Sequence, residues 1–286
     1  LIETISAAFE MEEILYELRD HCAGLNAGRW DYIFSIIKNY RGRGARFVFP
    51  DRNEVTMTVP FMRAYTELLV KTCHRRGAHA IGGMSAFITD PSDPEGNAQV
   101  IERVRADKRR EAGDGFDGTW VARADLVPEA RAEFDAVLGD RPNQLDRQRD
   151  DVEVTAAQLL DVHTGRSITD QGVYENVSGA IRYIESWLRG HGAVPIDHVV
   201  SDAATAEISR SQIWQWIHQD QRTAEGTPVT RDYVQGLVDQ LLGEAERSEH
   251  DRFEDAAEVF REVALSLEFP TFLTTSAYSR YLVERP

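Results

Sequence analysis

The sequence predicts an α/β protein, in which the later part of a (β/α)8 TIM-type barrel is followed by an all-α C-terminal domain. In the first half, short apolar or glycine-bounded segments alternate at least three times with helical periodicity, the pattern of parallel β/α units. Beyond residue 150 the helical periodicity continues and no strand pattern is convincing. We therefore predict a barrel portion at residues 1–145 and a helical domain at residues 146–286, with a charged linker at 140–149.

The barrel portion is expected to contain strands or strand-like segments separated by helices. Strands or strand ends are predicted at residues 1–3, 78–81 and 118–122, a strand or a tightly packed segment at residues 30–37, and a strand or an ordered loop segment at residues 46–49. Helices are predicted at residues 7–18, 60–77, 98–112 and 128–138. Chemistry in such barrels lies at the C-terminal ends of strands, and Glu3, Asp31, Met84 and Trp120 fall where strands end or loops begin.

Helical spacing of apolar residues dominates the second half of the chain. Helices are predicted at residues 152–162, 174–189, 208–219, 230–246 and 253–267. In the first half, the helix at 98–112 interleaves basic and acidic residues, among them Lys108 and Glu111. Its charges favour a solvated face, and contact of the basic residues with the phosphates of a polyanionic ligand is the alternative. His74 is expected to be structural or exposed.

Composition narrows the class of protein. With 286 residues, of which 42% are hydrophobic, the chain can build a sizeable core, and its net charge of −16 argues against nucleic-acid binding. No run approaches the ~18 apolar residues of a membrane helix. Cys22 and Cys73 fit a reducing compartment, and the last three residues, 284–286, do not form a Ser-Lys-Leu address. We expect a cytoplasmic protein without a membrane partner.

The stretch from Asp20 to Phe34 contains several of the main candidate functional residues of the first half of the chain. Gly24 and Gly28 permit close approach to the main chain, and burying Asp31 would be costly unless it were paired or bound to a metal. Glu3 lies about one β/α unit before Asp31, so neighbouring strand ends could bring both carboxylates to one cation, and oxygen ligands suit Mg²⁺. Spacing alone favours a structural ion pair or a helix cap at these positions.

The same stretch resembles the signature of a known protein family. From Arg19 to Phe34 the sequence follows the pattern basic–acidic–His–x–x–Gly–Leu–Asn–x–Gly–x–Trp–Asp–Tyr–x–Phe, which resembles the signature of the malate synthases of the isoform A branch. The similarity continues through the segments at 42–44, 47–52, 82–84 and 202–207. It implies that about half of the family's chain precedes Leu1, which is not an initiator methionine, so we expect a fragment.

The resemblance also implies roles for individual residues. Glu3 and Asp31 match the carboxylates that hold Mg²⁺, to which glyoxylate binds, and backbone N–H groups near Gly28, Trp30 and Asp31 could hold the carboxylate of glyoxylate in a nest. Asp202 matches the family's catalytic base, although the family often has a glutamate where this chain has Ser201.

Two of these roles have structural alternatives. Asp202 precedes an alanine-rich helix, where aspartate is a favoured N-cap. Met84 and Trp120 suit the lining of an acetyl-CoA channel because apolar and aromatic side chains accommodate a thioester arm, but core packing would explain them equally well. The polyanionic ligand considered for the basic residues of the helix at 98–112 would then be CoA.

The implied reaction is the Claisen-type condensation of acetyl-CoA with glyoxylate, followed by hydrolysis to malate and CoA, as in the glyoxylate bypass. The family supplies the positive partner of the enolate oxygen from an early barrel strand, so we expect this chain alone to be inactive. One alternative is a related Mg²⁺-dependent acyl-CoA lyase or synthase, and another is a non-catalytic helical interaction fragment.

Overall fold

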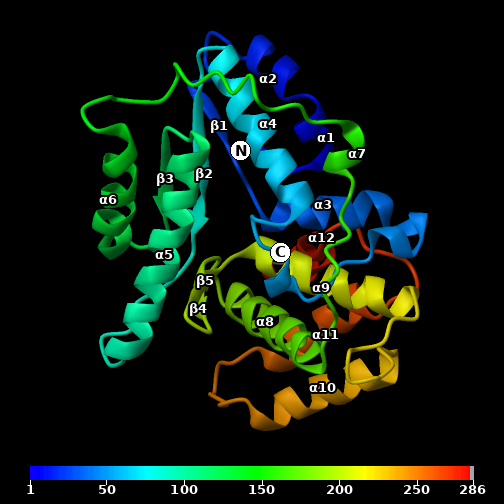
Figure 1. Cartoon of the computed structure of the whole chain (residues 1–286). Coiled ribbons are helices and arrows are strands. Elements are labelled where there is room, and N and C mark those ends of the chain that lie inside the picture. The colour runs from blue at the N-terminus through cyan, green and yellow to red at the C-terminus, as the bar shows by residue number, and fades with distance from the viewer. Residues whose placement is uncertain (284–286) are drawn as a thin grey trace. The chain divides into compact units, whose positions relative to one another are not determined.

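The computed structural model describes residues 1–283 and divides into two compact units (Figure 1). The first unit contains residues 1–32, 57–161 and 197–200, and the second contains residues 33–56, 162–196 and the chain from residue 201 onward. Within the described part of the chain, no helix is both long enough and apolar enough to span a bilayer. Residues 284–286, which are not a Ser-Lys-Leu address, lie outside the described residues.

The first unit is built from three strands and the helices between them. Its strands are β1 (Gly24–Asn26), β2 (His79–Ser85) and β3 (Gly118–Val121). Its helices are α1 (Ile5–Phe9), α2 (Met11–Glu17), α4 (Pro60–Arg75), α5 (Pro94–Asp114), η4 (Ala124–Leu126), α6 (Val127–Leu138) and α7 (Ala156–Leu159). Helix α3 (Trp30–Tyr40) begins in this unit and continues into the second, and strand β5 (Val199–Ser201) also ends in the second.

The three strands form a parallel sheet in sequence order. Leu25 of β1 pairs with Ala80 of β2, and Ile81 of β2 pairs with Gly118 of β3. At the outer edge of β1, Ile2 forms a parallel bridge to Ala27. Adjacent parallel strands joined by helical crossovers are the repeating β/α unit of a barrel, which confirms the predicted fold class.

Of the two alternatives for residues 30–37, the strand is wrong and the tightly packed segment is confirmed. These residues lie in α3, and the strand, β1, precedes them within the glycine-rich turn. Tyr32, Ile33, Phe34, Ile36 and Ile37 are all buried. A helix buried on several sides gives a continuous apolar run, which periodicity alone does not distinguish from a buried strand.

Most other elements of the first unit occur where they are predicted, with different limits. The helix expected at 7–18 is interrupted at Glu10, and β2 continues through Gly82 and Gly83 to Ser85 instead of ending at residue 81. The helix expected at 152–162 shortens to the single turn of α7. The segment at 140–149 has no helix, but it is packed: the Gln144 side chain donates hydrogen bonds to the carbonyls of Ala112 and Phe116.

The second unit is mainly helical. Its longer helices are α8 (Asp170–Leu188), α9 (Ala203–His218), α10 (Arg231–Glu244) and α11 (Phe253–Ala264). Its shorter elements are η1 (Arg41–Arg43), η2 (Ala45–Phe47), η3 (Arg52–Glu54), β4 (Val194–Ile196), α12 (Leu273–Ala277) and the single π-helical turn η5 (Tyr278–Leu282). The expectation that the second half lacks strands is therefore wrong at β4 and β5, which have only three residues each.

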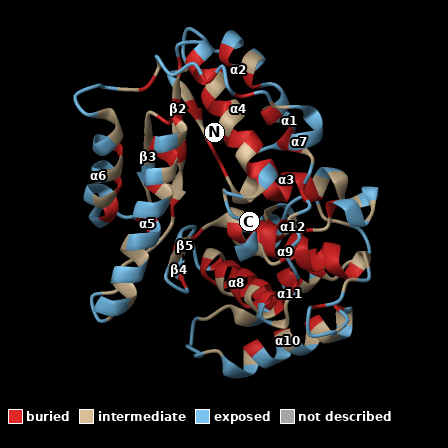
Figure 2. Ribbon diagram, viewed as in Figure 1, coloured by how far each residue is buried: buried red, intermediate tan, exposed pale blue. Residues whose placement is uncertain are grey.

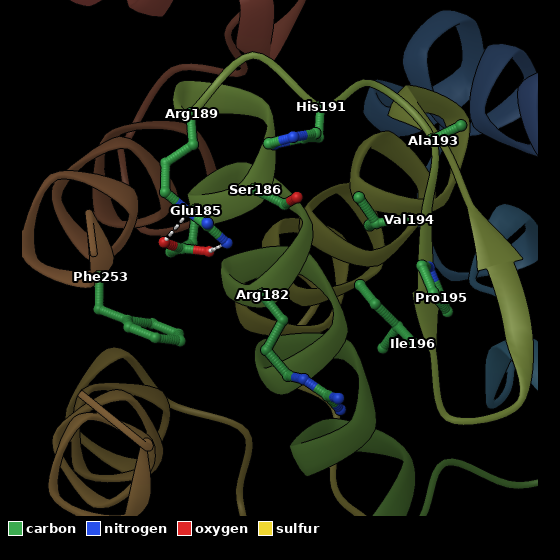
Figure 3. Close-up of a pocket in the computed structure, with 10 residues that line it drawn as sticks. All are labelled: Arg182, Glu185, Ser186, Arg189, His191, Ala193, Val194, Pro195, Ile196 and Phe253. Carbon is green, nitrogen blue, oxygen red and sulfur yellow. Dashed lines mark hydrogen bonds and ion pairs between the residues drawn. The ribbon is translucent and has the colours of Figure 1, made fainter. Parts of the chain in front are cut away.

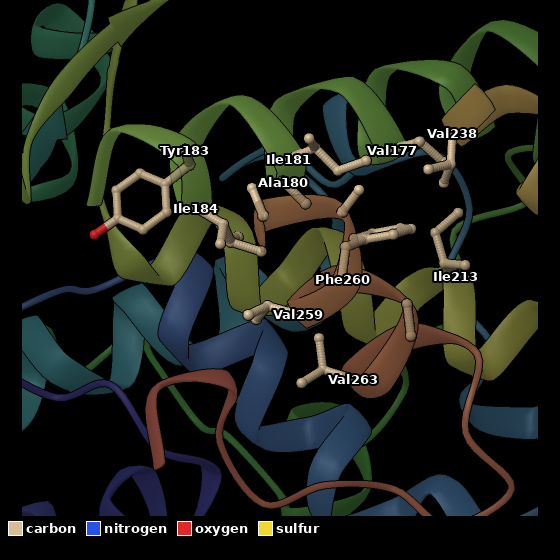
Figure 4. Close-up of a cluster of buried hydrophobic side chains, with 14 of the residues drawn as sticks. Val177, Ala180, Ile181, Tyr183, Ile184, Ile213, Val238, Val259, Phe260 and Val263 are labelled. Atoms are coloured by element: carbon tan, nitrogen blue, oxygen red, sulfur yellow. The ribbon is translucent and has the colours of Figure 1, made fainter. Parts of the chain in front are cut away.

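One hydrophobic core holds the four longer helices together (Figure 4). Val177 and Ile181 of α8, Ile213 of α9, Val238 of α10 and Phe260 of α11 are all buried in this cluster. In Figure 2 the buried colour is densest along α8 and α9. Every residue of α9 from 205 to 217 is buried, so the helix must find partners for its polar side chains as well as its apolar ones.

Three of these side chains, Gln212, Gln215 and Trp216, find their partners in the main chain of an irregular segment, residues 47–50. The Gln215 side chain donates to the Phe47 carbonyl at 2.7 Å and accepts from the Phe49 N–H at 3.1 Å. Trp216 Nε1 donates to the Phe49 carbonyl, and Gln212 Nε2 donates to the Pro50 carbonyl, both at 2.7 Å. The side chains of α9 thus take the place of a neighbouring strand, which explains why the contacts assign residues 33–56 to the second unit.

The division by contacts differs from the predicted domain limits of 1–145 and 146–286. Residues 146–161 belong to the first unit and residues 33–56 to the second, although they lie on the opposite sides of the predicted limit. The assignment of two independently folding domains remains a prediction.

A buried histidine and aspartate join α4, β2 and the segment at 140–149. His74 Nε2 lies 3.1 Å from Asp117 Oδ2, and His74 Nδ1 lies 2.7 Å from the Arg147 carbonyl. Asp117 also accepts from the N–H groups of Ala80 and Gln144. Burial by itself would lower the pKa of His74, but the hydrogen bonds to Asp117 and Arg147 outweigh it and raise that pKa above its usual 6.5. His74 is structural, as expected.

Replacing Gln215 by leucine should destabilise the second unit. The change removes the acceptor of one buried N–H and the donor to one buried carbonyl, and each lost partner costs about 1–3 kcal/mol. We expect the free energy of unfolding, measured by urea denaturation, to fall by roughly 2–4 kcal/mol. Gln240→Leu on the exposed face of α10 is the control and should change it by less than about 0.5 kcal/mol. Equal losses in the two variants would show that the 47–50 segment does not depend on Gln215.

The contribution of His74 to stability should depend on pH. Because the pKa of His74 is raised in the folded state, its contribution is fully present below the unfolded value of 6.5 and is lost as the pH rises through the folded value. The difference in unfolding free energy between the unsubstituted chain and His74→Gln should therefore be larger at about pH 5.5 than at about pH 8.5. His21→Gln, at an exposed position, is the control. A His74→Gln difference that stays constant over this interval contradicts the assignment.

Candidate functional site

Glu3 and Gly28 lie in direct contact at the end of the parallel strands. A Cβ atom on Gly28 would lie 2.2 Å from Glu3 Cγ and 2.7 Å from Glu3 Oε1, closer than non-bonded atoms approach. Only glycine therefore lets the half-buried carboxylate of Glu3 rest on this turn. The close packing gives Gly28 a structural role that the sequence pattern indicated without identifying the neighbour.

Tyr65 of α4 stabilises the contact between Glu3 and Gly28 by hydrogen bonds to the main chain beside it. Its hydroxyl group donates to the Ile2 carbonyl at 2.5 Å and accepts from the Gly28 N–H at 3.0 Å. Its ring stacks on Tyr32 with 4.1 Å between the centroids, and burial raises the pKa of Tyr65 well above 10. The Gly28 N–H also donates to the Ile2 carbonyl at 3.2 Å. This N–H is satisfied within the chain, so the predicted anion nest loses that donor.

Asp31 lies in the first turn of α3, three residues after Gly28. Because successive Cα atoms are 3.8 Å apart, its Cα lies within about 11 Å of the glycine on which Glu3 rests. Asp31 is half-buried, like Glu3. The fold therefore brings the Glu3 side chain to the turn that leads into Asp31. Asp31 itself lies in the first turn of a helix, whereas the sequence predicts that it lies where a strand ends or a loop begins.

The donor set at this turn suits a hard divalent cation. Among residues 1–283, no group of three or more His, Cys, Asp or Glu side chains forms a ready-made metal site. Mg²⁺ does not need such a group, because proteins usually hold it with one or two carboxylates, and water and substrate oxygens complete the octahedron. Two half-buried carboxylates, of which that of Glu3 rests in the space that Gly28 leaves, fit this requirement.

Trp30, at the start of α3, lies between the two carboxylate positions in sequence. The guanidinium carbon of Arg29 lies 4.0 Å from the centroid of the Trp30 ring, within the range of a cation–π contact. This contact orients the indole at the same turn. A direct role of Trp30 toward a substrate stays a prediction.

The structure brings Met84 and Trp120 together. They are register partners on β2 and β3, near the C-terminal ends of both strands. Met84 is half-buried, and Trp120 is 44% exposed, which is unusual for so large an apolar side chain. Two adjacent apolar side chains that are not fully buried are available for contact with a ligand.

Sequence reasoning missed two charged residues beside this pair. The alternating charges of α5 predict a solvated face. Lys108 and Glu111 are instead buried, and Lys108 is 0% exposed. Glu111 Oε1 accepts from the Gly83 N–H at 2.9 Å, and Lys108 Nζ donates to the Gly83 carbonyl at 2.7 Å. Burial raises the pKa of Glu111 to about 7, although the nearby Lys108 charge opposes the increase.

A signal for this burial was present in the sequence. Val104, Lys108, Glu111 and Ala112 are spaced at i, i+4, i+7 and i+8, and all four are buried on one face of α5. The two apolar members of this set mark the inward face. The charged pair falls on the same face, which the overall charge of the helix conceals.

Asp202 lies in the second unit and is the N-cap of α9. Its Oδ1 accepts from the Thr205 N–H at 3.3 Å, and its own N–H donates to Thr205 Oγ1 at 3.4 Å. The alternative of a helix cap is therefore what the local geometry shows. Asp202 is half-buried. Burial of the Tyr183 ring, together with the nearby charge of Asp202, raises the pKa of Tyr183 to about 12. Ser201, where the resembled family often has glutamate, is buried.

A buried ion pair anchors the helix that begins at Asp202. Glu207 and Arg210 lie one turn apart on α9, with 2.7 Å between Oε2 and Nη2. Glu207 also accepts from the Leu273 N–H, and the guanidinium carbon of Arg210 lies 4.3 Å from the centroid of the Phe269 ring. These contacts tie the first turns of α9 to the segment around α12, and so restrain the position of the Asp202 carboxylate.

A groove of about 430 Å³ opens between α8, β4 and the start of α11 in the second unit (Figure 3). Its buried carboxylate, Glu185, is already paired with Arg189 at 2.7 Å and accepts from the Arg252 N–H at 3.1 Å. None of the site residues predicted from the sequence lines it. It therefore does not belong to the candidate site.

Comparison with known proteins identifies the family. The model of the malate synthase TIM barrel domain matches residues 1–162, and the model of the malate synthase C-terminal domain matches residues 167–281. Malate synthase from Streptomyces clavuligerus is 60% identical over 287 residues, covering 98% of this chain and 53% of the relative.

More distant relatives agree. Malate synthase A from Escherichia coli K12 is 48% identical over 97% of this chain and 53% of its own length, and the glyoxysomal malate synthase of Candida tropicalis is 44% identical over 97% and 51%. The chain spans about half the length of the relatives it matches. Because both family models match and the identity extends over nearly the whole chain, this chain belongs to the malate synthase family.

Proposed function

We propose that this chain carries the metal and glyoxylate site and the catalytic base of a malate synthase. The observation that carries the proposal is the contact of Glu3 with Gly28, three residues before Asp31, in a chain whose family joins acetyl-CoA to glyoxylate. Glu3 and Asp31 would hold Mg²⁺, which when bound polarises the aldehyde of glyoxylate as a Lewis acid. Trp30 would close the site beside the bound glyoxylate.

Asp202 would act as the base. Its carboxylate removes a proton from the methyl group of acetyl-CoA, and the resulting enolate carbon forms a bond to the aldehyde carbon of glyoxylate, whose oxygen takes up a proton. Water then cleaves the thioester of malyl-CoA and releases malate and CoA. Asp202 needs a lone pair directed at the methyl group, and the hydrogen bond that it accepts from Thr205 is long, so capping leaves the carboxylate able to accept a proton.

Met84 and Trp120 would contact the thioester arm of acetyl-CoA. They are adjacent, apolar and incompletely buried, which suits a flexible acyl chain. The first half of the chain carries less of the acidic excess and is therefore the better surface for polyanionic CoA. We place the cationic partner of the enolate oxygen in the part of the relatives' length that this chain does not span. This chain alone should bind glyoxylate without turnover.

Calorimetric titration of glyoxylate into this chain tests the metal site. We expect binding in the presence of Mg²⁺, loss of binding on chelation, and at least about tenfold weaker binding by Asp31→Asn, since removing one of two carboxylates removes half of the protein's ligands. Asp202→Asn is the control and should bind glyoxylate normally. In a polypeptide that spans the full length of the malate synthase relatives, Asp202→Asn should instead reduce kcat by about 10²–10⁴-fold. Unchanged Mg²⁺-dependent binding by Asp31→Asn would remove the metal assignment.

Gly28→Ala should weaken the same binding without touching a carboxylate. The added methyl group would lie within 3 Å of the Glu3 side chain and displace its carboxylate. We expect Mg²⁺-dependent glyoxylate affinity to fall at least about tenfold, because ligand geometry must be held closely. Gly42→Ala is the matched control, since a Cβ there meets no atom within 4 Å. If both variants bind glyoxylate equally well, the position of Glu3 does not matter to the site.

A further inference from the structure

Strands β2 and β3 are paired out of step: between two successive cross-strand residue pairs, β2 contains one residue more than β3. Ile81 pairs with Gly118, whereas Met84 pairs with Trp120, so β2 uses three residue steps where β3 uses two. The extra residue forms a bulge at Gly82 and Gly83. Bulges re-aim the side chains that follow them and are rare between parallel strands.

The bulge decides which side chains meet. In a regular ladder continued from Ile81 and Gly118, Met84 would pair with Val121, and Trp120 would pair with Gly83. With the extra residue, Met84 and Trp120 become partners instead. Because side chains alternate between the faces of a strand, the shift also reverses the face on which Met84 lies relative to a regular strand.

Side chains from α5 hold the bulged backbone in place. The Gly83 N–H donates to Glu111 Oε1, and the Gly83 carbonyl accepts from Lys108 Nζ and, at 3.2 Å, from Thr119 Oγ1. The fit is tight, since a Cβ on Gly82 would lie 2.3 Å from the Glu111 carboxylate. Both main-chain groups of Gly83 are thus directed to a charged pair.

The buried Lys108–Glu111 ion pair is not explained by a contribution to stability alone. Lys108 is fully buried between Asp107, 3.1 Å away, and Glu111, 3.2 Å away. Desolvating such charges offsets most of their attraction, and apolar residues of similar size stabilise a core as well or better. What the pair provides that apolar residues do not is a donor and an acceptor at fixed positions for one peptide unit.

We infer that Lys108 and Glu111 are positioning residues for the acyl thioester: they fix the bulge at Gly82 and Gly83 and so create the Met84–Trp120 surface that contacts the thioester arm. The inference rests on the proposed function, in which Met84 and Trp120 bind acetyl-CoA. Neither charged residue touches the substrate. Their effect on binding passes through the register of β2.

Methyl NMR of this chain labelled with [methyl-¹³C]methionine tests the inference. The chain has four methionines, and Trp120→Ala identifies the Met84 signal through the loss of its ring-current shift. In the unsubstituted chain, acetyl-CoA should shift the Met84 signal in a saturable manner. Lys108→Met combined with Glu111→Leu removes the pair, and Asp107 keeps its ion pair with Arg110, so no charge is left unpaired. It should move the Met84 signal before ligand is added and weaken acetyl-CoA binding about tenfold.

Two further variants keep the result interpretable. Thr119→Val removes the third contact to the Gly83 carbonyl without changing any charge, and should shift the Met84 signal in the same direction by a smaller amount. Arg109→Met, at a side chain that is 59% exposed on the same helix, is the control and should change neither quantity. Mg²⁺-dependent glyoxylate binding, measured in parallel, should be unaffected by all of these variants.

The outcomes separate this inference from the proposed function. A Met84 signal that does not respond to acetyl-CoA, or that is unchanged in the folded double variant, overturns the inference even if glyoxylate binds normally. A displaced Met84 signal with unchanged acetyl-CoA affinity also overturns it, because the pair would then be merely structural. Loss of glyoxylate binding in the unsubstituted chain would contradict the proposed function and leave the Met84 measurement as a separate result.

Discussion

Buried main-chain groups that lie outside regular helices and ladders must be hydrogen-bonded, and much of this structure depends on how that requirement is met. Side chains meet it at several places, including three irregular segments. Tyr65 binds the turn at Gly28, Lys108 and Glu111 bind the bulge at Gly83, and Gln215 with its neighbours on α9 binds the segment at 47–50. Each irregular segment is fixed by a helix that is distant in sequence.

The same arrangement explains why buried charges are tolerated. Glu207 and Arg210, like Lys108 and Glu111, are ion pairs with little access to solvent, and each pair also binds main-chain groups. The pairs contribute little net stability compared with apolar packing, but an incomplete pair would leave an uncompensated charge in a medium of low dielectric constant. They act as complete sets, which makes the geometry that they impose on the backbone specific.

Glycines serve the candidate site by leaving room rather than by bending the chain. At Gly28 and Gly82, the missing Cβ is the space that a carboxylate occupies, from Glu3 in one case and from Glu111 in the other. This is a physical reason for glycine at the ends of strands where a malate synthase is proposed to bind a metal and a thioester. A carboxylate held against a glycine has little freedom to move, so its oxygens are positioned before any ligand arrives.

The sequence alone determined the α/β class, most of the helices, the family and the candidate residues Glu3, Asp31 and Asp202, because apolar periodicity and motif spacing are local properties. It could not determine that the run at 30–37 is a helix, since a segment buried on several sides has no polar face to reveal its period. The spacing of Val104 and Ala112 marks the inward face of α5, but only the tertiary structure showed that Lys108 lies buried against Gly83 and that residues 33–56 pack with α9. Both depend on hydrogen bonds between residues far apart in the chain, and no local pattern records such partners.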